Sequence, residues 1–306
     1  MNRFTLRAML VIVTCFVASP CAVCAADEGD GKDAKTRDPV RWTPTAWQSR
    51  EYESTPAFTP DGSKAIFMRA DPAFRRFRLL ESNCVAGRWT APREPSFASQ
   101  ASAHDGDPFI THDGSTLYFI STRHRFDSVG NEDFDIFSSV LDASGRWGTP
   151  KRLASPVNSP GAELWPSSDR SGSRYIGSSR PGGRGGSDVY VATRAESGAW
   201  ELAPVDEVNT TSNEYEAEVS PDGQRLAVVS DRTGRSRIHL YRRGGGRWIE
   251  FFVVRARDEV FQVGPRFSPD GKRLLFAQAE GGDSGEIMLL DIEEGADMRW
   301  PPMCGA

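Results

Sequence analysis

The stretch DPFITHDGSTLYFISTR (residues 107–123) sets the pattern for most of this 306-residue chain. An apolar segment leads into an Asp-Gly turn at 113–114, and an alternating segment leaves it. Asp-Gly supplies the positive φ that a tight hairpin turn needs, so the stretch predicts two antiparallel strands. Downstream, FDIF (134–137) and GRWGTPKRLASPVNS (145–159) complete a unit of three or four strands.

The same unit occurs five times along the chain. Its turn glycines recur at intervals of 48 to 58 residues, a spacing typical of propeller blades. One such unit cannot bury both of its faces, whereas successive sheets packed around an axis can. We therefore predict an all-β fold, a β-propeller of about five blades, each of mostly four antiparallel strands. The turns are TPDG (59–62), THDG (111–114), RSG (170–172), SPDG (220–223) and SPDG (268–271).

Six blades are the alternative, because the tryptophans outnumber the turns. Either Trp42 or Trp300 can supply the outer strand that closes the ring, and the other is then surplus. In a six-bladed ring, one degenerate blade would be split between the two termini. The tryptophans at blade-like spacing are Trp42, Trp89, Trp147, Trp200, Trp248 and Trp300.

The repeat resembles the WD40-like repeat called PD40, which is found in TolB-like β-propellers. The resemblance rests on the SPDG corner, on FISTR (119–123) and its counterparts, and on the G-x-W-x-x-P segment. It covers about residues 42–302 and implies a propeller, which in the TolB-like family usually has six blades. Many unrelated activities occur on propellers, so the resemblance implies little about function.

Residues 1–25 predict a secretory signal peptide. Arg3 and Arg7 precede the apolar run AMLVIVTCFV (8–17), and the small residues at 23–25 suit a signal peptidase. The alternative is an uncleaved membrane anchor. After cleavage, a polar leader (26–40) and a single propeller domain (41–306) remain, with no further transmembrane segment. We therefore expect an exported protein, in the periplasm or outside the cell.

Net charge argues about the kind of partner, and cysteine content about a disulfide. Loss of Arg3 and Arg7 changes the net charge from −5 to −7, which argues against nucleic-acid binding. Cleavage leaves Cys84 and Cys304 as the only cysteines. The last blade of a ring meets the first, so these two can pair in an oxidising compartment.

One column of the aligned repeats is acidic: Glu53, Asp105, Glu163 and Glu214, with Gln262 in the fifth repeat. Innermost strands line the axis of a propeller, so these carboxylates are candidates for a ligand or cation site at the channel mouth. The alternative is structural, because arginines follow in the same repeats and carboxylate–guanidinium pairs satisfy polar groups held in place. Those arginines are Arg123, Arg180 and Arg232.

No constellation in the sequence predicts catalysis, a metal site or a cofactor. His104, His112 and His124 lie beside aspartates in the second repeat, but without the spacing of a metal site. We predict an exported, non-catalytic propeller that acts as a protein-interaction or ligand-binding scaffold in the cell envelope. Its expected partner is a protein or an envelope component. The alternative is a propeller hydrolase or lyase that acts on glycans or esters through the carboxylates at the channel mouth.

Overall fold

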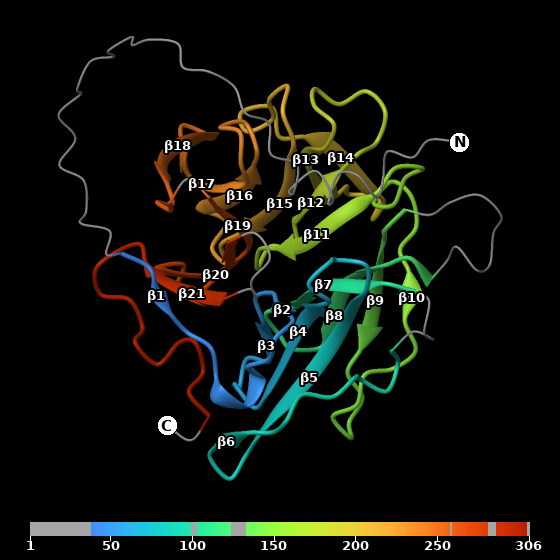
Figure 1. Cartoon of the computed structure of the whole chain (residues 1–306). Coiled ribbons are helices and arrows are strands. Elements are labelled where there is room, and N and C mark those ends of the chain that lie inside the picture. The colour runs from blue at the N-terminus through green and yellow to red at the C-terminus, as the bar shows by residue number, and fades with distance from the viewer. Residues whose placement is uncertain (1–37, 99–102, 124–132, 258, 281–285, 305–306) are drawn as a thin grey trace.

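The protein is a five-bladed β-propeller (Figure 1). The computed structural model describes residues 38–98, 103–123, 133–257, 259–280 and 286–304. Five antiparallel sheets surround one axis; the described residues contain no α-helix, and a 3-10 turn lies at Thr45–Trp47. The predicted signal peptide and most of the predicted leader lie outside the described residues.

In blades 1 to 4 the innermost strand comes first in the chain and the outer strands follow, whereas blade 5 takes its outermost strand from the N-terminal part of the chain. Blade 1 contains β2 (Tyr52–Glu53), β3 (Ala57–Phe58), β4 (Lys64–Ala70), β5 (Phe77–Val85) and β6 (Arg88–Trp89). Blade 2 contains β7 (Asp105–Ile110), β8 (Thr116–Ser121), β9 (Asp135–Val140) and β10 (Lys151–Arg152). Blade 3 contains β11 (Glu163–Ser168), β12 (Arg174–Ser178), β13 (Asp188–Arg194) and β14 (Trp200–Pro204). Blade 4 contains β15 (Glu214–Val219), β16 (Arg225–Ser230), β17 (Arg237–Gly244) and β18 (Arg247–Val253). Blade 5 contains β19 (Val260–Phe267), β20 (Arg273–Glu280), β21 (Glu286–Asp291) and β1 (Val40–Arg41).

The N-terminal strand closes the ring. β1 is the outer strand of blade 5, with Val40 opposite Leu289, and the next amide, on Trp42, donates to the Ile287 carbonyl at 2.7 Å (Figure 1). Trp300 makes no strand and instead packs in a cluster with Trp42 at this junction. The prediction of five blades is therefore confirmed and the six-bladed alternative is wrong, since one tryptophan closes the ring and the other fills space beside it.

The two ends of the propeller differ. At one end, the turn face, the five Gly turns join the first and second strands of each blade. Their glycines have φ between 67° and 90°, as the Asp-Gly pattern predicts. At the other end, the mouth face, the innermost strands begin, and the connections between second and third strands lie there, such as 71–76, 179–187 and 231–236.

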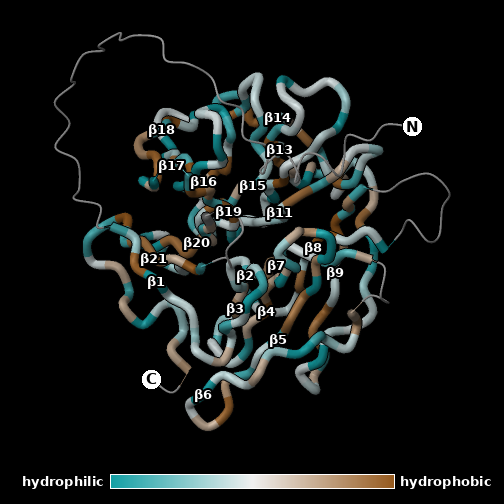
Figure 2. The backbone as a smooth tube through the Cα atoms, viewed as in Figure 1, coloured by the Kyte–Doolittle hydropathy of each residue, from teal (hydrophilic) through white to brown (hydrophobic). Residues whose placement is uncertain are grey.

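Apolar side chains between adjacent blades form the core. Figure 2 shows that hydrophobic residues gather in the strands and hydrophilic ones in the connections. One cluster joins blades 3 and 4 through Val189, Ala217 and Val228, all with no exposed surface. Burial of this kind contributes about 25 cal/mol per Å² of apolar surface, and it is what holds neighbouring sheets together. In the described part of the chain, no helix is long and apolar enough to span a membrane.

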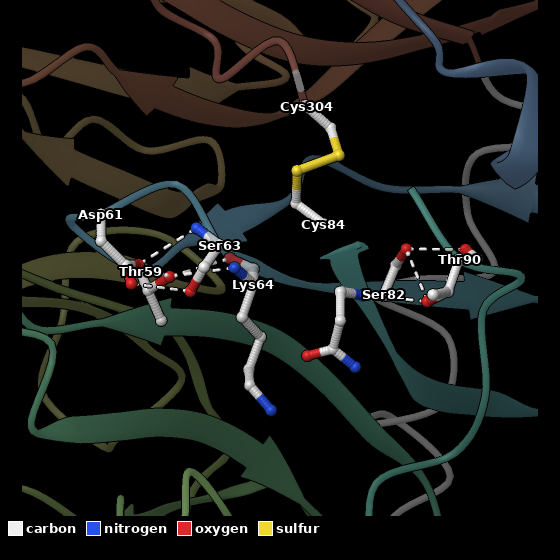
Figure 3. The surroundings of a disulfide bond; sticks show 9 residues. Thr59, Asp61, Ser63, Lys64, Ser82, Cys84, Thr90 and Cys304 are labelled. Atoms are coloured by element: carbon white, nitrogen blue, oxygen red, sulfur yellow. Dashed lines mark hydrogen bonds between the residues drawn. A yellow bond between two sulfur atoms is a disulfide. The ribbon is translucent and has the colours of Figure 1, made fainter. Parts of the chain in front are cut away.

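A disulfide ties the C-terminal segment to the first blade (Figure 3). Cys84, near the C-terminal end of β5, is bonded to Cys304, which lies 220 positions away in the sequence, with Cα atoms 5.3 Å apart. The preceding segment packs on the first turn, where a Cβ on Gly62 would lie 2.9 Å from Pro302. Blade 5 is thus joined to its neighbour twice, by β1 and by this disulfide.

Replacing both Cys84 and Cys304 with serine is expected to lower the free energy of unfolding by about 2–5 kcal/mol, because the bond closes a very long loop in the unfolded chain. Thermal denaturation with and without reductant measures the effect. Reductant should lower the melting temperature of the wild type and leave the double variant unchanged. Equal melting temperatures for wild type and variant under oxidising conditions would contradict the prediction.

Candidate ligand site on the propeller axis

The acidic column lies at the mouth face, where each innermost strand begins, and its side chains are buried. In blade 1, Glu53 forms an ion pair with Arg69 at 2.8 Å. In blade 2, Asp105 accepts from Ser121 Oγ at 2.6 Å and forms an ion pair with Arg123 at 2.9 Å. Each carboxylate thus has partners within its own blade.

The column continues in the same way in blade 3. Glu163 accepts hydrogen bonds from Ser159 and Ser178 and forms an ion pair with Arg180 at 3.2 Å. Burial raises the pKa of Glu163, and these contacts oppose that effect.

In blade 4 the pattern changes. Glu214 accepts from Thr210 Oγ1 at 2.8 Å and from Ser230 Oγ at 2.6 Å, while Arg232 forms an ion pair with Glu250 instead. In blade 5, Gln262 takes the column position and donates to the Arg255 carbonyl. These local bonds favour the structural interpretation of the column, and its role in ligand binding stays a prediction.

A second ring lies two residues further along each innermost strand, and this one meets at the axis. The Trp165 amide of blade 3 donates to Asp107 Oδ2 of blade 2 at 3.3 Å, and the Gly264 amide of blade 5 donates to Glu216 of blade 4. We call this set the axial ring: Thr55, Asp107, Trp165, Glu216 and Gly264.

Backbone irregularities bring the axial ring together. The register shifts at this point in the innermost strands of blades 2 to 5, and Asp107, Trp165 and Gly264 have φ of 46°, 47° and 66°. A Cβ on Gly264 would lie 2.9 Å from Thr55 Oγ1 and 3.4 Å from the Trp165 ring. Glycine at this position therefore permits the close approach of blades 1, 3 and 5.

Below the axial ring, toward the turn face, an ion pair and an indole fill the axis. Arg266 lies 3.0 Å from Glu218, and its other terminal nitrogen donates to the Pro108 carbonyl at 2.6 Å. The Trp165 indole donates to Glu218 at 3.3 Å and has only 1% of its surface exposed. Blades 2, 3, 4 and 5 are thereby linked across the axis at this level.

Burial raises the pKa values of the axial carboxyls. The pKa of Asp107 is raised to about 7 by loss of solvent, although Trp165 and Arg266 oppose the shift. Burial also raises the pKa of Glu216 well above its ordinary value, and the negative charge of Asp107 adds to that. Burial likewise raises the pKa of Glu218 to about 7, although its ion pair with Arg266 opposes the shift. Two close carboxyls resist ionising together, so the ring holds protons near neutral pH.

Two hydroxyls next to the axial carboxyls are buried and lack hydrogen-bond partners among the described residues. They are Tyr52 Oη and Thr55 Oγ1, on side chains that are 2% and 0% exposed. Burial raises the pKa of the Tyr52 phenol, and the negative charges of Glu216 and Asp107 raise it further. Its ring packs against Phe74 and Phe261 at centroid distances of 5.0 and 6.1 Å. Acidic, hydroxylic and aromatic groups therefore adjoin at this end of the axis.

The axial ring is not among the residues predicted from the sequence, because the most regular acidic column is formed by the first acidic residue of each innermost strand. The signal was available, since Asp107 and Glu216 both lie two residues after column members and share a repeat register. What the pattern does not reveal is the bulge that turns these residues toward the axis.

The histidines of the second repeat do not gather at a site. His104 accepts from the Phe77 amide, and His112 bonds the Ser168 carbonyl, while His124 lies outside the described residues. Within the described ranges, no group of three or more His, Cys, Asp or Glu side chains is placed to hold a metal ion.

Comparison with known proteins supports the fold and leaves the activity open. No family model and no curated protein matches the chain. A structure assigned as TolB from Agrobacterium tumefaciens is 19% identical with a TM-score of 0.52, covering 82% of this chain and 81% of that chain. Zg3597, a family 117 glycoside hydrolase from Zobellia galactanivorans, is 12% identical with a TM-score of 0.57, covering 86% and 93%. The chain is thus similar in fold to TolB-like and hydrolase propellers, and the PD40 assignment stays a prediction.

We expect Asp107→Asn to stabilise the protein at high pH. A folded-state pKa of about 7, above the ordinary 3.8, means that the native state holds this proton more tightly than the unfolded state. The resulting stability is full below about pH 4 and is lost as the pH rises toward 7. The variant should therefore gain about 1–3 kcal/mol over wild type at pH 8 and little at pH 4.

Urea denaturation across this pH range measures the gain. Asparagine tolerates positive φ and can still accept from the Trp165 amide, so the backbone is preserved. Asp142→Asn is the matched control, because that aspartate lies in an exposed turn and its pKa is lowered. A difference between Asp107→Asn and wild type that does not change with pH would contradict the raised pKa.

Glu163→Gln tests the structural role of the acidic column. The change leaves Arg180 half-buried without its carboxylate, so the free energy of unfolding should fall by about 1–3 kcal/mol. Glu201→Gln, an exposed glutamate of the same blade, should change it by less than about 0.5 kcal/mol. Chemical denaturation measures both, and an unchanged midpoint for Glu163→Gln would exclude the structural role.

Proposed function

We propose that this chain is an exported, non-catalytic β-propeller that binds a protein or cell-envelope component at its mouth face, with a cationic group of the partner received by the axial ring. The predicted signal peptide and the Cys84–Cys304 disulfide support export, since such bonds persist in oxidising compartments. Periplasm and cell exterior both satisfy this requirement.

The observation that carries the proposal is the charge balance on the axis. Arg266 is already paired with Glu218, which leaves Asp107 and Glu216 close together with raised pKa values. A lysine, arginine or amine of a partner would replace their protons and supply the missing positive charge. The unpartnered hydroxyls of Tyr52 and Thr55 add acceptors for its N–H groups.

Aromatic side chains beside the ring suit the same ligand. Tyr52, Phe74 and Phe261 form a contiguous group, and Phe74 lies in the 71–76 connection of the mouth face. Ring faces attract cations and pack against the apolar stem of a lysine or arginine. The acidic pair and the aromatic group together favour a cation over an anion or a wholly apolar ligand.

A second candidate function is hydrolysis of glycans or esters. The observation in its favour is the interaction between Asp107 and Glu216, two buried carboxyls whose titrations affect each other. Acid–base catalysis uses one protonated and one ionised carboxyl, and pairs with separated pKa values provide them. Turnover of aryl glycosides or esters that disappears in both Asp107→Asn and Glu216→Gln would favour this alternative.

A pull-down from cell-envelope extract tests the binding function. The chain without residues 1–25 serves as bait, beside an Asp107→Asn/Glu216→Gln double variant and a Glu201→Gln control. We expect one partner enriched by the wild type and the control and reduced about tenfold by the double variant, which folds but lacks the charges. Calorimetry with that partner in buffers of different ionisation enthalpy should report proton release. Equal enrichment by the double variant would exclude the axial ring as the contact.

A further inference from the structure

A surface pocket of about 460 Å³ lies on the turn face of blade 3, away from the axial ring. Arg174, Arg194 and Trp200 line it, together with Ser171 and Ser173 of the adjoining turn, and none of its lining residues carries a carboxylate. These residues come from β12, β13 and β14, three neighbouring strands (Figure 1). The pocket is therefore polar and cationic.

Strand register places both guanidinium groups over one indole. Arg194 is directly opposite Trp200, and Arg174 is opposite Ala192, two residues before Arg194, so the three side chains share one face of the sheet. The guanidinium carbons lie 4.2 Å (Arg174) and 4.4 Å (Arg194) from the centroid of the Trp200 ring. Both positively charged side chains thus pack against the Trp200 ring.

Neither charge is neutralised. Arg174 donates to the Tyr118 hydroxyl and Arg194 to the Gly198 carbonyl, both neutral oxygens. Among the described residues, no carboxylate forms an ion pair with either side chain. The nearby Asp169 side chain accepts hydrogen bonds from Ser171 and Ser173 within the turn, and it forms no ion pair with Arg174 or Arg194. Each guanidinium has five N–H donors, so most remain available to a ligand.

The other blades show what this position normally has. A cation lies two residues after the turn glycine in four blades, and blade 2 has Thr116 there. The cation is Arg174 in blade 3, and in blades 1, 4 and 5 it is paired with a carboxylate. In blade 4 Arg225 pairs with Glu293, in blade 5 Arg273 pairs with Asp291 at 2.7 Å, and in blade 1 Lys64 lies 3.6 Å from Glu81.

In these three blades a carboxylate thus lies beside the cation, whereas in blade 3 a second arginine, Arg194, lies beside Arg174. Burial lowers the pKa of Arg174, and the charge of Arg194 lowers it further, which is the cost of holding two cations together.

We propose that this pocket binds an oxyanion, a carboxylate, phosphate or sulfate group, held between Arg174 and Arg194 with the body of its ligand against Trp200. Planar guanidinium groups match such oxygens in paired hydrogen bonds. This inference is independent of the cation proposed for the axial ring and lies on the opposite face of the propeller.

Calorimetry at low ionic strength tests the proposal with three probes: inorganic phosphate, sulfate and a galacturonate oligosaccharide, beside a neutral oligosaccharide of equal length. Saturable binding of at least one anionic probe is expected, weakened about tenfold or more in Arg194→Gln. Arg194 is exposed, so this variant should keep its fold, and Arg174→Gln should give the same loss. Equal binding of all three anions indicates a bare oxyanion site, and preference for the oligosaccharide indicates an acidic glycan.

Arg243→Gln is the matched control. That arginine lies 4.2 Å from the Trp248 centroid in blade 4 and donates to the Tyr175 hydroxyl, repeating the stacked arrangement with one arginine. Binding should be unchanged in it. Failure of every anionic probe to saturate, or an equal loss in Arg243→Gln, would overturn the proposal.

Discussion

The pairing of β1 with β21 is the interaction on which the rest of the molecule depends. A few hydrogen bonds around Val40 and Trp42 turn a row of five sheets into a ring. Without a ring there is no axis, and the innermost strands of blades 1 and 5 would not meet. The contacts of Gly264 with Thr55 cross this junction, so the axial ring exists only because the outer edge of blade 5 is closed.

The meeting of five innermost strands at the axis restricts which residues can lie there. Five strands that meet at one line leave little room, so a position near the centre holds glycine, a bulged backbone or a side chain that fills the gap. Trp165 fills it, and Arg266 and Glu218 neutralise each other beneath it. Asp107 and Glu216 have no ion-pair partner of this kind among the described residues, and burial raises their pKa values even though Arg266 partly opposes the shift of Asp107. The same geometry that stabilises the centre therefore leaves it able to take up positive charge.

The fold could be predicted from the repeats in the sequence. Asp-Gly turns require positive φ and therefore mark hairpins, and the spacing between the turns is the length of one blade. It did not suffice for the site. Glu53, Asp105, Glu163 and Glu214 form the most regular acidic column, yet each is occupied by partners of its own blade. Residues that recur in nearly every blade serve the fold. An acidic residue occupies the axial position only in blades 2 and 4, as Asp107 and Glu216, and blade 3 departs from blades 1, 4 and 5 by placing Arg194 rather than a carboxylate beside its cation. Whether a side chain at such a position faces the axis depends on bulges, which single-sequence patterns do not encode.

Closure by the N-terminal strand also orders events during biogenesis. The first strand of the described chain pairs with β21, the last one, so the ring cannot close until residues up to Asp291 have been synthesised. If the chain crosses a membrane from its N-terminus, β1 reaches the far side before its partner β21. The backbone hydrogen-bonding groups of β1 then stay unpaired while the other blades cross and fold. An exposed strand edge is a site for wrong pairing. Such a crossing would include an interval in which the nascent propeller is an open array, and a factor that protects it would have to recognise that open edge rather than the finished ring.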